Sequence, residues 1–283
     1  MPTFIAPDGS ELAFAVKGAA DDGAGPLIVI PGGPMRDPVY LGDLGGLSEH
    51  RQLIILNLRG TGASSVPADP ASYRCDRQVA DVEALRVHLG LEQLDLLGHS
   101  AGSNLAVLYA AEHPDRVSKL TLAAPSLRVL GLGPTDEGRE QAWRLRRHEP
   151  WFAEAEAAVR RIDEDEDAAS DEDWLLSSRF AYGRWDEEIE EFERSSASQY
   201  NDEAAGTYIS DGAFDPPTTK AALAKLSAPV LILAAEYDWN PRPVVAAHAA
   251  GCFPNARLAV QAGAGHFPWL DSPEAFVRLV TES

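Results

Sequence analysis

Gly98-His99-Ser100-Ala101-Gly102 is the stretch that decides the fold, because it places a serine between two glycines at the G-x-S-x-G spacing. A largely apolar run at residues 94–97 (LDLL) comes directly before it, and a helical pattern at about residues 104–112 follows. A serine on a sharp strand-to-helix turn has strained backbone geometry and an exposed hydroxyl, and the flanking glycines let other segments pack against the turn. The following helix N-terminus favours developing negative charge. The stretch therefore predicts that Ser100 is a nucleophile.

Outward from this turn, short apolar runs alternate with helical patterns. Because such runs are typical of strands buried on both faces, the alternation predicts a mostly parallel sheet flanked by helices, with a short antiparallel start around a turn at Asp8-Gly9. The two segments that carry this rhythm are residues 1–128 and 216–283. Besides 94–97, the predicted strands are residues 11–17, 27–30, 53–56, 117–123, 230–234 and 257–260, and the predicted helices are about residues 75–89, 104–112 and 273–280.

The intervening segment, residues 129–215, has a different composition. Its stretch from residue 134 to 215 holds 24 acidic residues against 9 basic ones, and four of the six tryptophans. Tryptophans need burial, which argues against a disordered linker, whereas the acidic run at residues 163–167 is typical of a solvated loop. Helical patterns at residues 143–161 and 186–194 predict a helical cap over one end of the sheet, with the pocket between cap and sheet.

A serine hydroxyl needs a base to take its proton and an acid to orient that base. Among seven histidines, His266 has the best position, in the Gly-rich loop after the last predicted strand, whereas His99 adjoins the nucleophile and adjacent residues on a turn point apart. Asp238 follows the strand that begins at residue 230, with Glu236 as the alternative acid. The order serine, aspartate, histidine matches the order of triad members in one of the three common serine hydrolase arrangements.

An oxyanion hole needs two backbone N–H groups directed at the tetrahedral intermediate. Ala101, directly after the nucleophile, is expected to supply one of them. The other should come from the loop after the strand at residues 27–30, which reads Pro31-Gly32-Gly33-Pro34. Proline has no N–H, so either Gly32 or Gly33 is the second donor.

Charge and composition exclude several classes of protein. The net charge of −20 disfavours nucleic acid and anionic membranes as partners, and it is explained by solubility or, near a pocket, by attraction of cationic substrates. There is no signal-peptide pattern and no apolar run of 18 residues. Cys75 and Cys252 lie far apart, and no metal-site spacing or phosphate-binding glycine loop occurs. We therefore expect a cytoplasmic protein with no metal and no cofactor.

These motifs together resemble the proline iminopeptidase branch of the α/β-hydrolases. The loop Pro31-Gly32-Gly33-Pro34-Met35 is similar to the family's HGGPG, residues 57–64 (NLRGTGAS) are similar to DxRGxGxS, and the Tyr237-Asp238 and Gly263–His266 segments are similar to the acid and base segments. The resemblance implies the α/β-hydrolase fold, Gly33 as the second oxyanion donor and cap acids that hold a substrate amine. The family's leading histidine and its GxSWG tryptophan are replaced here by Pro31 and Ala101.

The expected reaction is cleavage of an acyl bond in a small molecule or short peptide through an acyl-enzyme, with an N-terminal prolyl amide as the first candidate substrate. A carboxylesterase or thioesterase is the first alternative, and a ligand-binding homologue without turnover is the second. Dehalogenase and epoxide hydrolase chemistry is disfavoured, because those relatives have aspartate in place of Ser100. Within the cap, Trp185 is the candidate for contact with substrate; the oligomeric state is left open.

Overall fold

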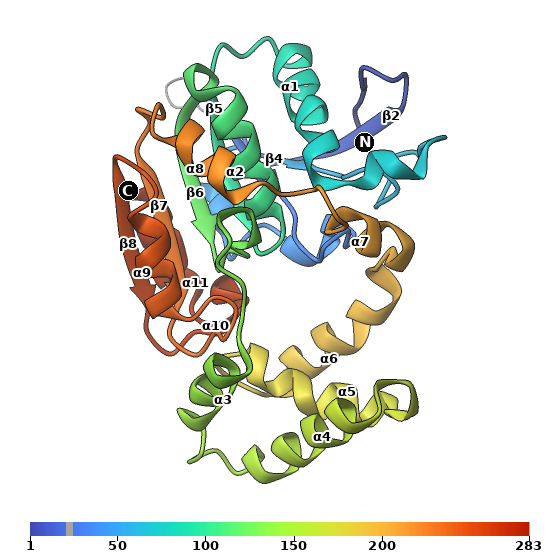
Figure 1. Cartoon of the computed structure of the whole chain (residues 1–283), viewed down its shortest axis with the longest axis vertical. Helices are drawn as coiled ribbons and strands as arrows, with labels where there is room; N and C mark the ends of the chain where they lie inside the picture. Colours follow the sequence, from blue (N-terminus) through green and yellow to red (C-terminus); the bar gives the residue numbers. More distant parts are fainter. Residues whose placement is uncertain (21–24, 283) are drawn as a thin grey trace.

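One eight-stranded sheet organises the chain, of which the computed structural model describes residues 1–20 and 25–282 (Figure 1). The strand order is β1-β2-β4-β3-β5-β6-β7-β8. The β1–β2 and β2–β4 pairs are antiparallel, and every other neighbouring pair is parallel, which confirms the predicted mostly parallel sheet. The strands are β1 (Thr3–Ile5), β2 (Glu11–Lys17), β3 (Leu27–Ile30), β4 (Leu53–Leu56), β5 (Leu94–His99), β6 (Val117–Ala123), β7 (Val230–Ala235) and β8 (Ala256–Gln261).

Helices cover both faces of the sheet, because alternate residues of each buried strand point to opposite faces. In β3, Ile28 and Ile30 join the core cluster formed with α1, α2, α8 and α9, whereas Leu27 and Val29 join the cluster formed with α10 and α11. All four β3 side chains are buried, which is why the run lacks polar alternation. These helices are α1 (Val79–His88), α2 (Gly102–Glu112), α8 (Pro216–Leu223), α9 (Pro243–Ala250), α10 (Pro268–Asp271) and α11 (Pro273–Thr281).

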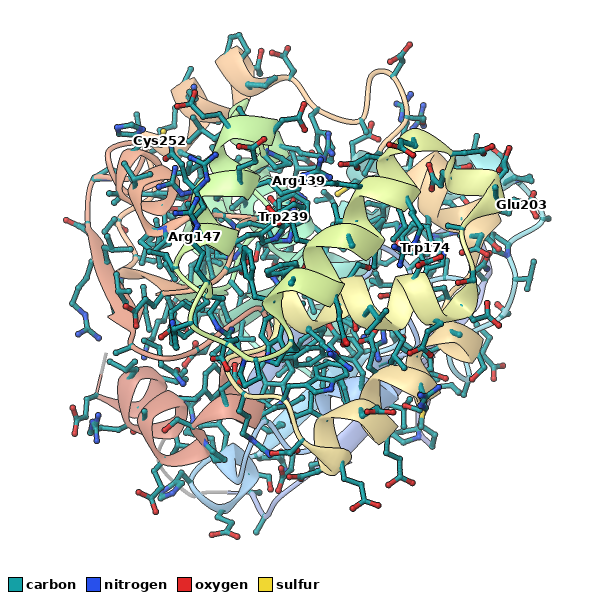
Figure 2. The ribbon with its side chains drawn as sticks, turned by 90° about the horizontal axis from the view of Figure 1, so that it is seen from below. Arg139, Arg147, Trp174, Glu203, Trp239 and Cys252 are labelled. Carbon is teal, nitrogen blue, oxygen red and sulfur yellow. The ribbon has the colours of Figure 1, made fainter. Side chains whose placement is uncertain are left out.

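The segment between β6 and β7 contributes five helices before α8. In Figure 1, α3 to α6 lie beyond the end of the sheet to which β6 points, and Figure 2 looks onto them from that end. We call all five helices, α3 to α7, the cap helices. They are α3 (Asp136–Arg144), α4 (Phe152–Glu164), α5 (Asp171–Ser178), α6 (Glu187–Ser196) and α7 (Asp202–Tyr208).

The prediction of one continuous helix over residues 143–161 is wrong. The chain leaves the helical path after Arg144 and resumes it at Phe152. Pro150 explains the break, because proline disfavours helical geometry in the residue before it and supplies no N–H. The break brings Trp143 and Trp151 against Phe180, with ring centres 4.8 and 5.3 Å apart, so a small aromatic core holds this part of the cap helices together.

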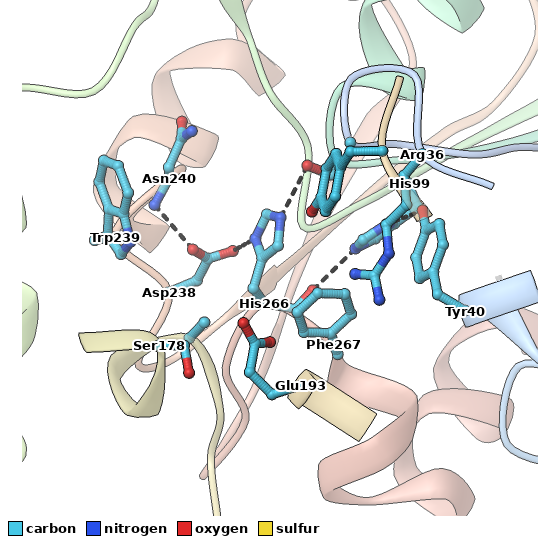
Figure 3. A pocket seen from close by; sticks show the side chains of 14 residues that line it. Arg36, Tyr40, His99, Ser178, Glu193, Asp238, Trp239, Asn240, His266 and Phe267 are labelled. Atoms are coloured by element: carbon cyan, nitrogen blue, oxygen red, sulfur yellow. Dashed lines mark hydrogen bonds and ion pairs between the residues drawn. The ribbon is translucent and has the colours of Figure 1, made fainter. Parts of the chain in front are cut away.

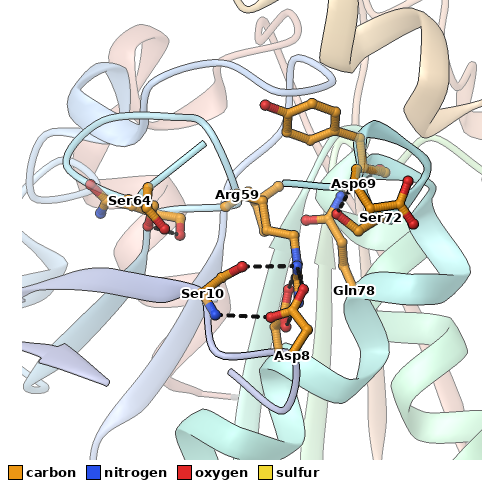
Figure 4. A network of polar contacts seen from close by, with 12 residues as sticks. Asp8, Ser10, Arg59, Ser64, Asp69, Ser72 and Gln78 are labelled. Carbon is orange, nitrogen blue, oxygen red and sulfur yellow. Dashed lines mark hydrogen bonds and ion pairs between the residues drawn. The ribbon is translucent and has the colours of Figure 1, made fainter. Parts of the chain in front are cut away.

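A buried arginine anchors the loop that follows β4 (Figure 4). Arg59 is 3% exposed, and its guanidinium donates two hydrogen bonds to Asp81 of α1, at 2.5 and 2.6 Å, and one to Asp8. Hydrogen bonding to Arg59 lowers the pKa of Asp8 to about 2. The loop, the β1–β2 turn and α1 are therefore joined through one cation.

We expect Arg59→Met to destabilise the fold by about 3–5 kcal/mol, because it leaves the carboxylate of Asp81, 1% exposed, buried without a counter-ion. Urea unfolding followed by circular dichroism measures the effect. Arg77→Met is the matched control, since the Arg77 side chain is 66% exposed, and it should change the free energy of unfolding by less than about 0.5 kcal/mol. A loss below about 1 kcal/mol for Arg59→Met would contradict the anchoring role.

Candidate active site

Ser100 lies on the turn between β5 and α2 with a backbone φ of +50°, a left-handed conformation that non-glycine residues rarely adopt. Its N–H donates to the carbonyl of Ala123 at 3.1 Å, and its own carbonyl accepts from the N–H groups of Ser103 and Ser126, so hydrogen bonds hold the strained conformation. The side chain lines a cavity at the carboxyl end of the sheet. The turn thus exposes the hydroxyl to that cavity, as the motif predicts.

The glycines of the turn are required by close packing. A Cβ on Gly102 would lie 2.4 Å from the carbonyl oxygens of both Ile30 and Pro31, and a Cβ on Gly98 would lie 2.8 Å from the Cα of Ser103. These distances are shorter than any normal contact. Side chains at either position would therefore push β3 and α2 away from the nucleophile.

His266 lies in the loop after β8 and is held by its backbone, because its N–H donates to the carbonyl of Ala181 at 2.6 Å. Its Nε2 lies 2.8 Å from the Ser100 hydroxyl oxygen (Figure 3). Its Nδ1 lies 2.8 Å from Oδ2 of Asp238. A carboxylate only accepts, so Nδ1 carries the proton, and the lone pair of Nε2 faces the serine hydroxyl.

Asp238 follows β7 and is 1% exposed. Its other oxygen, Oδ1, accepts from the N–H of Asn240 at 2.9 Å, which leaves Oδ2 directed at the imidazole. The alternative acid, Glu236, has a different partner, because it accepts from the N–H of Gly263 at 2.7 Å. The structure therefore joins Asp238, and not Glu236, to His266.

The two candidates for the second oxyanion donor differ in their partners. The Gly32 N–H donates to the hydroxyl of Tyr40 at 2.7 Å, so it is already engaged. Gly33 lines the cavity with a φ of +125°. Within residues 1–20 and 25–282, the N–H groups of Gly33 and Ala101 donate no hydrogen bond. This arrangement leaves Gly33 and Ala101 as the free donors beside Ser100.

His99 is a polar residue of the site that sequence reasoning set aside. Its Nδ1 lies 2.8 Å from the Tyr40 hydroxyl, and its Nε2 lies 2.9 Å from the carbonyl oxygen of His266. Because the carbonyl only accepts, Nε2 carries the proton and Nδ1 accepts from Tyr40. Burial lowers the pKa of His99 well below its ordinary value, so the ring is neutral. Gly32, Tyr40, His99 and His266 thus form one hydrogen-bonded series that links the oxyanion loop to the loop of the base.

The cavity beside Ser100 has a volume of about 290 Å³, and its wall contains one positively charged and one negatively charged side chain. Arg36, from the loop after β3, and Glu193, from α6, line it in addition to the residues above. Trp185 does not line this cavity and instead packs edge-on against Tyr182, with ring centres 5.6 Å apart. The remaining lining residues are Ser178, Ala181, Tyr200, Trp239, Asn240 and Phe267.

In the part of the chain that the structure describes, no helix has the length and apolar character needed to cross a membrane. Over the same residues, no group of three or more His, Cys, Asp or Glu side chains is arranged to hold a metal ion.

Comparison with known proteins identifies relatives over most of the chain. A proline iminopeptidase of Lactobacillus helveticus is 26% identical over 270 residues, which cover 91% of this chain and 88% of that protein. The AB hydrolase superfamily protein YclE of Bacillus subtilis is 27% identical over 289 residues, which cover 95% and 93%. A proline iminopeptidase of Heyndrickxia coagulans is 33% identical, but over 124 residues that cover only 43% of that protein.

Solved structures with the same fold include a proline iminopeptidase and an esterase. The proline iminopeptidase of Mycobacterium smegmatis matches with a TM-score of 0.76 and 23% identity over 99% of this chain and 97% of that one. An esterase of Exiguobacterium antarcticum matches with a TM-score of 0.73 and 22% identity over 100% and 98%. The family model of the alpha/beta hydrolase fold matches residues 25–273. The chain therefore belongs to the α/β-hydrolase fold family and is a hydrolase that resembles the proline iminopeptidases.

Proposed function

We propose that the chain is a serine hydrolase that cleaves an acyl bond of a small molecule or short peptide through an acyl-enzyme. One observation carries the proposal: Asp238, His266 and Ser100 form a continuous series of hydrogen bonds, with both distances at 2.8 Å, at the wall of a cavity. A triad with these roles is recognised by geometry, not by sequence position.

In the proposed reaction, Nε2 of His266 takes the proton of Ser100 as the serine oxygen attacks the acyl carbon. The N–H groups of Gly33 and Ala101 stabilise the oxyanion, and Asp238 stabilises the imidazolium. His266 then gives the proton to the leaving group, and the acyl chain remains on Ser100. Water, deprotonated by His266, attacks this ester, and collapse of the second intermediate returns the proton to Ser100 and releases the acid.

For the substrate, we propose an N-terminal prolyl amide, with Glu193 as the group that binds its free amine. Three observations support this choice: α6 brings the carboxylate of Glu193 to the same cavity as Ser100, the Tyr182 hydroxyl donates a hydrogen bond to it at 2.5 Å, and several sequence relatives are named proline iminopeptidases. An ester or thioester is the second candidate, favoured by the structural match to an esterase. The cytoplasmic location stays a prediction.

Glu193→Gln should separate the two candidates, because it removes the charge that would pair with an amine and keeps the shape of the side chain. We expect KM for a prolyl arylamide to rise about 10-fold or more, with little change for a short p-nitrophenyl ester. Steady-state kinetics on both substrates measures the effect. Glu190→Gln, on the same helix but outside the cavity, is the control. If the wild-type chain hydrolyses only the ester, the aminopeptidase proposal is wrong.

A further inference from the structure

Arg36 lies in the wall of the cavity, three residues after the proposed oxyanion donor Gly33 (Figure 3). Its side chain comes from the loop after β3, and the residue is only 2% exposed. A guanidinium stays charged at any physiological pH, so the cavity has a permanently positive group in its wall.

The guanidinium of Arg36 lies among aromatic rings. Its central carbon is 4.5 Å from the ring centre of Tyr40 and 5.3 to 5.8 Å from three other rings. Its Nε donates to the side-chain oxygen of Gln199 at 2.8 Å, whereas its buried Nη2 has no hydrogen-bond partner. The other three rings are those of Phe192, Tyr200 and Phe267.

No carboxylate compensates this charge within the described part of the chain. The other two buried arginines there, Arg59 and Arg146, form ion pairs with Asp81 and Glu149, respectively. Arg36 forms none, although Glu193 lines the same cavity. Aromatic faces and one neutral hydrogen bond offset only part of the cost of burying a cation, so Arg36 is an exception that needs an explanation.

A purely structural role does not explain the charge. The backbone already joins the loop of Arg36 to the segment between α6 and α7, because the N–H of Asp37 donates to the carbonyl of Gln199 at 2.8 Å and the N–H of Asn201 donates to the carbonyl of Met35 at 3.1 Å. A neutral side chain would preserve both hydrogen bonds. The unpaired cation in the wall of the cavity that Ser100 also lines therefore points to an anion supplied by the substrate.

We propose that Arg36 binds a carboxylate of the substrate, so that the cavity selects acyl compounds that carry a carboxylate close to the bond that is cleaved. This inference rests on the proposed hydrolase function and names its substrate class. A carboxylate matches the planar, forked donors of a guanidinium. Tyr200 is 41% exposed, whereas Tyr40 is 4% and Phe267 is 7% exposed, so Tyr200 is the ring that moves aside at least cost to admit the carboxylate to Nη2.

Matched substrates test the inference on each side of the scissile bond. On the acyl side, mono-p-nitrophenyl succinate is compared with p-nitrophenyl butyrate, in which a methyl group replaces the carboxylate. On the leaving-group side, prolyl-glycine is compared with prolyl-glycinamide. We expect kcat/KM to be about 10- to 100-fold higher for the carboxylate in at least one pair, the size of a charged hydrogen bond. The pair that responds identifies the side on which the carboxylate binds.

Substitution then assigns the preference to Arg36. Arg36→Gln should reduce the ratio within the responding pair to within about twofold, because it removes the charged donor. Arg194→Gln removes a positive charge from an exposed ion pair with Glu190, outside the cavity, and should leave the ratio unchanged. Fluorophosphonate labelling of Ser100 checks that each variant retains a reactive nucleophile.

Two results would overturn the inference: a wild-type chain that turns over both members of each pair equally, or an Arg36→Gln variant that keeps the preference. The first can be read on the wild-type chain alone, so it decides even if the variant does not fold. Absence of both turnover and labelling in the wild-type chain would overturn the proposed function and this inference with it. Turnover without a charge preference would overturn the role of Arg36 alone.

Discussion

Replacement of Ser100 by alanine is expected to lower kcat by a factor of about 10⁶, the order found when the nucleophile of a serine hydrolase is removed. In the proposed reaction the attacking atom is the Ser100 oxygen, which lies 2.8 Å from Nε2 of His266, so without it no covalent intermediate can form. The residual rate would come from the oxyanion donors and from substrate binding. Hydrolysis of a p-nitrophenyl ester, followed by absorbance, measures the change.

The control for this prediction is Ser103→Ala, three residues further along. The Ser103 hydroxyl donates to the carbonyl of Gly98 at 2.9 Å and does not line the cavity, so its loss should affect stability more than turnover. Near-full turnover by Ser100→Ala would refute the assignment of the nucleophile. Circular dichroism of both variants shows whether they fold.

Asp238→Asn is expected to have the second largest effect, a fall in kcat of about 10⁴-fold. An asparagine amide can donate to Nδ1 of His266, which would favour the tautomer with the proton on Nε2. That nitrogen would then face the Ser100 hydroxyl as a donor and could not accept its proton. The hydrogen bond from the Asn240 N–H to Oδ1 would still hold the side chain in place, so the variant tests the tautomer and not the position.

Glu236→Gln is the matched control for Asp238→Asn. It removes a carboxylate two residues away whose oxygen accepts from the Gly263 N–H, and the amide oxygen of glutamine can accept the same hydrogen bond. We expect its kcat to stay within about twofold of the wild-type value. If Glu236→Gln lost more activity than Asp238→Asn, the acid would be Glu236 and the assignment made from the geometry would be wrong.

Most strands could be predicted from sequence because they contain a short, largely apolar run. The bounds predicted for residues 27–30, 53–56 and 117–123 are those of β3, β4 and β6. In β3 and β4 the apolar run itself is the buried segment, whereas β6 also includes Ser118 and Lys119, which are not buried. Period and composition were less informative in the cap helices. There the helical pattern predicted over residues 143–161 does not reveal the break after Arg144. Pro150, which lies within this range, is the signal that could have located it.

Pairings between segments far apart in the chain could not be read from residue types. The residue types alone leave Gly32 and Gly33 as alternatives and the family resemblance implies Gly33, whereas the structure separates them physically, because the Gly32 N–H donates to Tyr40. His99 was set aside because it points away from the nucleophile, yet that direction brings it between Tyr40 and the carbonyl of His266. Arg36 lies in a loop with no motif of its own. Its proposed role in binding a carboxylate depends on two features that only the structure shows, namely the aromatic rings around its guanidinium and the lack of an ion pair with a carboxylate in the described part of the chain.

Labelling with a fluorophosphonate, followed by peptide mapping, tests most directly whether the hydrogen-bonded series activates one serine. The reagent reacts with a serine oxygen whose proton a neighbouring base accepts. The account predicts one adduct per chain on the peptide that contains Ser100, and its near absence in a His266→Ala variant. An adduct on another residue, no adduct on the folded wild-type chain, or equal labelling of the His266→Ala variant would contradict it.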